Sequence, residues 1–187
     1  MTDKTTTVDK KRIQTKELTL IGLMTAITCI LGPMSIPIPV SPVPISLTNF
    51  VLFLTIYVLG MKLGTLSYII YLCLGAVGLP VFSSFSGGLG KLAGPTGGYL
   101  IGFIFLALIQ GALMERFPGK NTAAVVGMII GNLVCYAFGT VWLAGQMELN
   151  FAAALGVGVI PYLPGDAVKI VISAIIGPKL RSAVKRI

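Results

Sequence analysis

The sequence contains no histidine and only six acidic residues among 187. Histidine is the commonest general base and metal ligand near neutral pH, so its absence removes the usual partner of a nucleophile or a metal ion. Only Glu148 and Asp166 lie outside the segments interpreted as cytoplasmic and the start of the first apolar run. No Ser/His/Asp triad, catalytic carboxylate pair or metal-ligand cluster can be built from this set. We therefore expect no enzyme, no metal site and no cofactor bound by the chain itself.

Cysteine is also scarce. Cys29, Cys73 and Cys135 are far apart in the sequence, and each lies within an apolar run. A zinc site would need closer spacing, and a disulfide would need cysteines in an oxidising loop. The sequence therefore predicts buried, packing roles for all three cysteines.

Charged residues make up only 11% of the chain, whereas hydrophobic residues make up 55%. Soluble domains contain about 25% charged residues, so this composition indicates an integral membrane protein surrounded by lipid. The net charge of +8 alone would suggest a nucleic-acid partner. However, most basic residues lie in short connections between apolar runs, which is a topology signal, and we expect no binding to nucleic acid.

Six apolar runs are interpreted as transmembrane helices. They cover residues 18–34, 47–60, 64–79, 97–114, 122–144 and 164–180. The second and third are shorter than the ~20 residues of a standard span, but the glycines between them favour a turn over one continuous helix. Residues 151–160 are apolar but too short to cross, and we interpret them as an interfacial or re-entrant segment.

The distribution of basic residues predicts the orientation. With the N-terminus inside, all fourteen basic residues except Lys91 and Lys169 fall on the inner side, as the positive-inside rule requires. A seventh crossing by residues 151–163 would leave the basic C-terminus outside. We therefore predict an all-α integral membrane protein with six transmembrane helices and both termini in the cytoplasm. Its parts are a polar cytoplasmic tail at 1–17, one membrane domain at 18–181 and a basic cytoplasmic tail at 182–187.

Three unusual segments fall on the predicted outer side. Residues 33–44 contain five prolines, which cannot propagate a helix and predict an extended loop. Residues 80–98 are rich in glycine and serine and end in Pro95-Thr96, which is typical of a helix start. The third segment leads into Asp166. Elaborate outer segments and short inner turns favour capture of a ligand from outside.

Asp166 and Lys169 are three residues apart at the start of the sixth span, so they share one helix face. A charged group within a span costs roughly 2.5–3.5 kcal/mol on insertion scales and is usually functional. Separately, Asp166 could be an acid favoured by the helix dipole, and Lys169 could extend back to the membrane surface. Together they offer an acceptor beside donors, which suits a neutral amide-like group or a charged ligand.

Other candidates have two interpretations each. The segment from Gly94 to Tyr99 could present free N–H groups to a ligand or form a tight turn with close packing. Tyr99 and Trp142 near outer helix ends could be interfacial aromatics or a flat wall for a ring. Gly22 and Ala26 form a small-xxx-small pair, which suits either a partner helix or packing within the chain.

Several motifs together resemble one family. They are Gly87-Gly88, the run Ala93-Gly94-Pro95-Thr96-Gly97-Gly98-Tyr99-Leu100 with Gly102-Phe103, Gly139-Thr140 with Trp142-Leu143, the run Pro161-Tyr162-Leu163-Pro164-Gly165-Asp166 with Lys169, and Pro42-Val43-Pro44-Ile45-Ser46-Leu47. The chain is thereby similar to BioY, the biotin-specific S component of energy-coupling factor (ECF) vitamin transporters. The resemblance implies the S-component fold in a bacterial plasma membrane, with biotin bound from outside for uptake. It also implies partners: a transmembrane coupling protein and two cytosolic ATPases that use ATP.

The resemblance also implies residue roles. Asp166 and Lys169 would bind the ureido ring of biotin. The further substrate-binding candidates are Ser84, Phe85, Thr96, Tyr99 and Trp142. Gly22 and Ala26 would contact the coupling protein. Thr48 stands where the family often has Gln. The alternatives are an S component for a different vitamin and a non-transporting membrane scaffold whose outer loops bind a protein.

Overall fold

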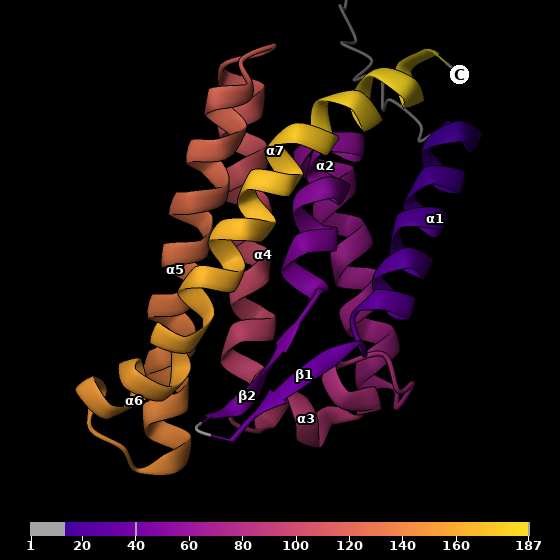
Figure 1. Cartoon of the computed structure of the whole chain (residues 1–187). Coiled ribbons are helices and arrows are strands. Elements are labelled where there is room, and N and C mark those ends of the chain that lie inside the picture. Colours follow the sequence, from indigo (N-terminus) through magenta and orange to yellow (C-terminus); the bar gives the residue numbers. More distant parts are fainter. Residues whose placement is uncertain (1–13, 40, 187) are drawn as a thin grey trace, which may run out of the picture.

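The computed structural model describes residues 14–39 and 41–186, so most of the polar tail predicted at 1–17 lies outside the described residues. The described chain is a bundle of long helices with a small β-hairpin and short helices at one end (Figure 1). The elements in chain order are α1 (Thr15–Leu31), β1 (Ser35–Ile38), β2 (Ser41–Ser46), α2 (Thr48–Ala76), η1 (Ser83–Phe85), α3 (Leu89–Ala93), α4 (Gly97–Arg116), α5 (Asn121–Met147), α6 (Phe151–Gly158), η2 (Ile160–Tyr162) and α7 (Leu163–Arg186).

Helix α2 reverses direction at Gly60 and therefore supplies two of the membrane helices. Gly60 has φ +76° and ψ −172°, which is outside the helical region and accessible to glycine. A Cβ on Gly64 would lie 2.6 Å from the Cδ1 atom of Ile56, which one straight helix would not allow. The residues on either side of Gly60 thus form two antiparallel arms (Figure 1), and the predicted turn between the second and third spans is confirmed.

Four helical segments of the described residues are long and apolar enough to cross a membrane, namely Thr48–Ala76, Gly97–Arg116, Asn121–Met147 and Phe151–Val184. The first of these segments is the double arm of α2. In the last, α6 is set apart from α7 at Val159, whose φ of −129° is not helical. With the 17-residue α1, the described chain contains six long helices.

The two ends of the bundle differ in the way that the sequence predicts. The start of α1, the turn at Gly60, the α4–α5 connection and the C-terminus lie at one end (Figure 1). The β-hairpin, α3 and α6 lie together at the other end. The three segments predicted to share one side of the membrane do share one end. The assignment of that end to the outside follows from charge counting and stays a prediction.

The proline-rich segment is extended, as predicted, but it is a paired hairpin and not a loop. Strands β1 and β2 pair antiparallel, with Ser35 opposite Ser46 and Ile36 opposite Ile45. The register is irregular between Ile36 and Ile38, at a proline. Prolines are tolerated here because both strands of a two-stranded ribbon are edge strands, on which a missing N–H need not interrupt a ladder.

The core lies between the two arms of α2 and helices α4 and α5. Its largest fully buried side chains are Tyr68, Tyr71, Phe53, Phe82, Leu52 and Ile56. Helices α4 and α5 can approach closely because Gly131 has no Cβ. A Cβ at this position would lie 2.9 Å from the Cα of Leu106.

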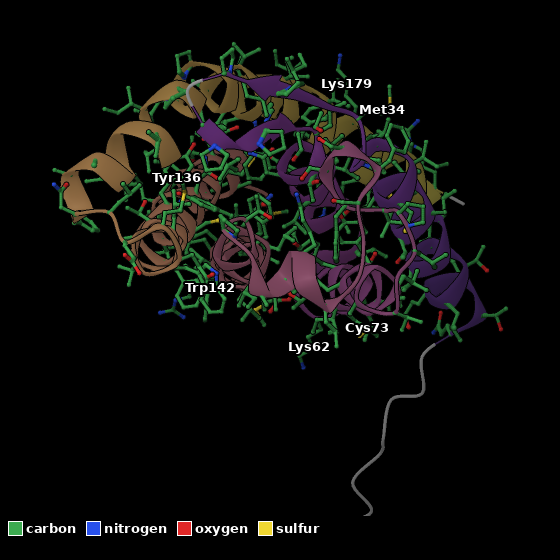
Figure 2. The ribbon with its side chains drawn as sticks, turned by 90° about the horizontal axis from the view of Figure 1, so that it is seen from below. Met34, Lys62, Cys73, Tyr136, Trp142 and Lys179 are labelled. Atoms are coloured by element: carbon green, nitrogen blue, oxygen red, sulfur yellow. The ribbon has the colours of Figure 1, made fainter. Side chains whose placement is uncertain are left out.

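The predicted burial of the three cysteines is only partly correct. Cys135 is buried and Cys29 is half-buried, but Cys73 is exposed. Figure 2 shows Cys73 at the rim of the bundle. Helix α2 buries its other face, which carries Tyr71, Leu72 and Gly75, so Cys73 points away from the other helices.

Candidate functional site

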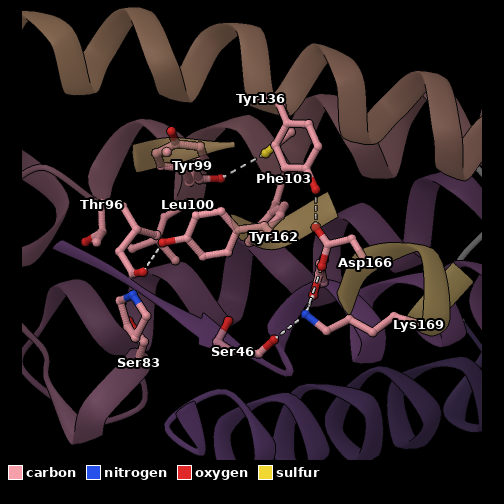
Figure 3. A pocket seen from close by; sticks show the side chains of 15 residues that line it. Ser46, Ser83, Thr96, Tyr99, Leu100, Phe103, Tyr136, Tyr162, Asp166 and Lys169 are labelled. Carbon is pink, nitrogen blue, oxygen red and sulfur yellow. Dashed lines mark hydrogen bonds and ion pairs between the residues drawn. The ribbon is translucent and has the colours of Figure 1, made fainter. Parts of the chain in front are cut away.

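A pocket opens at the hairpin end of the bundle, between strand β2, helices α4 and α5, and the α6–α7 junction. Its empty volume is about 560 Å³, which includes open space at its mouth. Figure 3 shows Tyr99 and Tyr162 on one side of the pocket and Asp166 and Lys169 on the other, with Tyr136 beside Asp166. A mostly apolar cavity with a few convergent polar groups is the usual form of such a site.

The carboxylate of Asp166 forms the polar centre of this pocket. Its Oδ1 atom accepts hydrogen bonds from Asn49 Nδ2 at 2.8 Å and from Lys169 Nζ at 2.9 Å. Its Oδ2 atom accepts from Asn132 Nδ2 at 3.2 Å and from the Tyr136 hydroxyl. A carboxylate has about four lone-pair sites, so the described residues already use them all.

Lys169 is equally well satisfied. Its ammonium group donates to the Ser46 carbonyl at 2.7 Å, to Asn49 Oδ1 at 2.9 Å and to Asp166 Oδ1 at 2.9 Å. The side chains of Lys169 and Asp166 are only 12% and 9% exposed. The contacts of Lys169 with Ser46 on β2 and Asn49 on α2 favour pairing within the protein over extension towards the membrane surface. A polar ligand group must therefore exchange with partners within the protein.

The aromatic wall comes from three separate elements. Tyr99 and Phe103 lie on α4, Tyr136 lies on α5 and Tyr162 lies on η2 (Figure 3). Such flat surfaces suit a ring-containing ligand, because they bury a large apolar area with few rotatable bonds. The position of the Tyr99 ring depends on a glycine in α5. The ring packs directly against Gly139, where a Cβ would meet it.

Tyr162 also links the two sides of the pocket mouth. Its hydroxyl is within hydrogen-bond distance of Ser41 Oγ, at 2.6 Å, and of the Val43 carbonyl, both on β2. The hairpin and η2 are therefore joined across the mouth.

Thr96 and Tyr99, two of the predicted substrate-binding residues, lie on the pocket wall. Both are buried, and neither hydroxyl makes a hydrogen bond to another described residue. Helix α4 begins after Thr96, but the Thr96 side chain does not cap the helix. A buried hydroxyl without a partner is costly, so the Thr96 hydroxyl is a candidate ligand contact. The Tyr99 hydroxyl instead lies against α6, where a Cβ on Gly158 would meet it.

Three other predicted binding residues do not line the pocket. Ser84 bonds to Ser35 of β1, with 3.0 Å between their Oγ atoms, and its neighbour Ser83 faces the cavity instead. Phe85 is 69% exposed. Trp142 lies at the edge of the bundle (Figure 2) and donates from Nε1 to the Gly94 carbonyl at 3.0 Å.

The glycine-rich turn before α4 is a packing device. The Gly97 N–H donates to the Gly94 carbonyl at 3.0 Å. A Cβ on Gly97 would meet the Leu92 carbonyl oxygen, and one on Gly98 would meet the side chain of Trp142. These contacts favour the tight-turn interpretation of the segment.

Comparison with known proteins identifies the family. Residues 4–186 of the chain match the BioY family. The chain belongs to the BioY family.

Its relatives in this family are named as biotin transporters. The probable biotin transporter BioY of Pyrococcus horikoshii is 39% identical over 169 residues, which cover 90% of this chain and 98% of that protein. The biotin transporter BioY of Thermotoga maritima is 38% identical over 174 residues, covering 89% and 96% of the two chains. A crystal structure of the S component for biotin from an ECF-type ABC transporter matches with a TM-score of 0.83 and 31% identity, covering 89% of this chain and 91% of that one. The chain is thus an integral membrane protein of a transporter family with the S-component fold.

The sequence interpretation missed the residues that complete the charged network of this BioY-family pocket. Asn49 bridges Asp166 and Lys169 from α2, and Asn132 and Tyr136 reach Asp166 from α5. The available signal was that buried polar residues within apolar runs usually pair with one another. Asn132 and Tyr136, four residues apart, also share one face of α5.

The small residues of α1 face away from the bundle. Gly22 and Ala26 are exposed, and a Cβ on Gly22 would meet nothing within 4 Å. Leu18 and Ile30 on the same helix are also exposed, at 60% and 67%. Close packing within the chain therefore does not explain this small-xxx-small pair.

Proposed function

We propose that this chain binds biotin in the pocket around Asp166 and mediates its uptake as the S component of an ECF-type transporter. Membership of the BioY family and similarity to proteins named as biotin transporters support this proposal. The likeness to a solved biotin S component extends over most of the chain. The cell membrane, crossed six times with both termini in the cytoplasm, is the proposed location.

The observation that carries the proposal is the buried acid–base pair at the base of an aromatic pocket. The ureido group of biotin has two N–H donors and one carbonyl acceptor. Asp166 accepts hydrogen bonds and Lys169 donates them, within 2.9 Å of each other, so the pair matches both ends of that group. The Thr96 hydroxyl, which makes no hydrogen bond to another described residue, adds a further polar contact for the ligand.

Binding in this site is an exchange of hydrogen bonds. Asp166 and Lys169 are fully satisfied before the ligand arrives, so each ureido contact replaces one made by Asn49, Asn132, Tyr136 or Ser46. Exchange of one hydrogen bond for another contributes little net free energy. Much of the affinity must then come from burying the rings against Tyr99, Phe103 and Tyr162, while the polar pair provides selectivity.

The proposed partners are a transmembrane coupling protein and two cytosolic ATPases, which hydrolyse the ATP. The outward-facing small residues Gly22 and Ala26 of α1 are the proposed contact with the coupling protein. Small residues let the backbones of two helices approach closely within lipid, and this favours packing against a second membrane protein. The chain itself needs no cofactor in this scheme.

The test is equilibrium binding of radiolabelled biotin to the purified full-length chain in detergent. We expect saturable binding with a Kd below micromolar, and no competition by thiamine or riboflavin. Binding of either vitamin in place of biotin would favour an S component for another ligand. A chain that binds none of the three contradicts the proposal.

A ligand analogue provides a sharper control. In 2-iminobiotin the ureido carbonyl is replaced by an imine, which gives a protonated, cationic group at neutral pH. Placed beside the Lys169 ammonium, this cation would be repelled, and we expect at least about tenfold weaker binding. Equal affinity for biotin and 2-iminobiotin would show that Lys169 does not face the ureido oxygen.

A further inference from the structure

A second, larger pocket lies at the opposite end of the bundle from Asp166. Its empty volume is about 1010 Å³, including its open side. It lies between the first arm of α2, the connection from α4 to α5 and the last turns of α7. In Figure 1 this is the end that holds the C-terminus, which is the end predicted to face the cytoplasm.

The charge of this pocket is positive. Lys120, Arg181 and Arg186 line it, and no acidic side chain does. Among the described side chains the one ion pair is Lys169–Asp166 at the far end of the bundle, so these three cations have no acidic partner within that part of the chain. Like charges in one cavity repel each other, and a bound anion would relieve that repulsion.

The remaining walls are apolar, and the base is held firmly. Buried Met114 and Ala124 line the pocket, together with Phe117 and Pro178. Asn121, the first residue of α5, accepts from the Tyr57 hydroxyl at 2.7 Å and donates to the Ala174 carbonyl at 3.0 Å. These bonds fix the start of α5 against α2 and α7.

The pocket therefore combines an apolar wall with a cationic rim at the ends of membrane-spanning helices. The start of α5, a 27-residue helix without a side-chain cap, adds the positive end of its dipole beside Lys120. Basic pockets between transmembrane helices on the cytoplasmic side are suited to anionic lipid headgroups. A soluble phosphate compound would use the cations but leave the apolar walls exposed.

We propose that this pocket binds the phosphate group of an anionic phospholipid. Arg181 and Lys120 hold the phosphate, since both donate charge-assisted hydrogen bonds. The acyl chains follow the apolar wall formed by Met114, Phe117 and Pro178. This site is independent of the biotin pocket and of the α1 face, so it stands whether or not the chain binds biotin.

The test is native mass spectrometry of the full-length protein in nonionic detergent with added phosphatidylglycerol or phosphatidylcholine. The variant is Lys120→Gln with Arg181→Gln. The matched control is Lys16→Gln with Lys62→Gln, which removes two cations from the same end but outside the pocket. We expect the variant to bind phosphatidylglycerol at least about tenfold more weakly and the control to stay within about twofold of wild type.

Three results would overturn the proposal. Equal losses in variant and control would indicate a diffuse attraction to the basic end. Equal binding of phosphatidylcholine and phosphatidylglycerol would show that the anionic headgroup is not recognised. Displacement of the lipid by millimolar inorganic phosphate would identify a soluble anion as the ligand. Elution as a single species and an unchanged Tm check the folding of each variant, and Arg181→Gln alone replaces the double variant if that fails to fold.

Discussion

Replacing Asp166 by Asn should affect both biotin binding and stability. The isosteric amide can still accept from Asn49 and Lys169, but its NH₂ group then faces the Asn132 Nδ2 donor, which lies 3.2 Å from the present Oδ2 atom. Lys169 keeps the Ser46 carbonyl and Asn49 Oδ1 as partners but loses its counter-charge. Removing one partner of a buried ion pair costs about 3–5 kcal/mol. We expect the lower end, about 3 kcal/mol, because Lys169 retains two acceptors.

Biotin affinity should fall at least about tenfold in this variant, which corresponds to ~1.4 kcal/mol. The measurement is equilibrium dialysis with radiolabelled biotin, at a temperature at which circular dichroism shows Asp166→Asn to be folded. The same samples give the Tm. Glu148→Gln is the matched control, since Glu148 is an exposed acid at the same end of the bundle and does not line the pocket.

Two outcomes would refute the reasoning. If folded Asp166→Asn binds biotin as well as Glu148→Gln does, Asp166 is not a ligand contact and serves only within the charged network. If the two variants have the same Tm, the network around Asp166 does not stabilise the fold. The second result would leave the binding prediction intact, so the two parts can fail separately.

Three further substitutions test other parts of the structure. Gly22→Trp should leave biotin affinity unchanged and impair co-purification with the coupling protein, because it fills an exposed small-residue site; normal co-purification would contradict this. Gly139→Ala should weaken biotin binding at least about tenfold, because its Cβ would meet the Tyr99 ring, whereas Gly145→Ala meets nothing and serves as the control. Tyr136→Phe should lower the free energy of unfolding by about 1 kcal/mol yet raise biotin affinity, because it frees one carboxylate lone pair; calorimetric titration giving weaker binding would show that the hydroxyl itself contacts the ligand.

Much of the fold follows from hydrophobic run length and charge placement. The reversal at Gly60 was predictable because two short apolar runs flank two glycines. The strand pairing of the proline-rich segment was not predictable. Proline lacks the backbone N–H that donates hydrogen bonds between strands, so a proline-rich sequence does not indicate a paired strand. Its register depends on tertiary contacts that no local pattern contains.

The candidate site was predictable only in part. Asp166 and Lys169 stand out in sequence because charge is rare in an apolar span. Asn49 does not, since its importance depends on a contact across 117 residues. The position of Trp142 near a helix end suggests a wall of the site, but the rotation of α5 turns this residue to the edge of the bundle (Figure 2). That rotation depends on close contacts such as the one between Gly98 and Trp142.

The contact between Tyr162 and strand β2 has a kinetic consequence. The Tyr162 hydroxyl joins the two sides of the mouth of the pocket by its contacts with Ser41 and Val43. Opening it breaks these bonds and the packing of Val43 against the cluster around Tyr99 and Val159, but it leaves the long helices in place. Entry and escape of a ligand can therefore be fast relative to unfolding. A ligand that packs against both sides would hold the mouth shut and lengthen its own residence time. Substitutions in the hairpin should therefore alter the dissociation rate of the ligand more than substitutions deep in the pocket do.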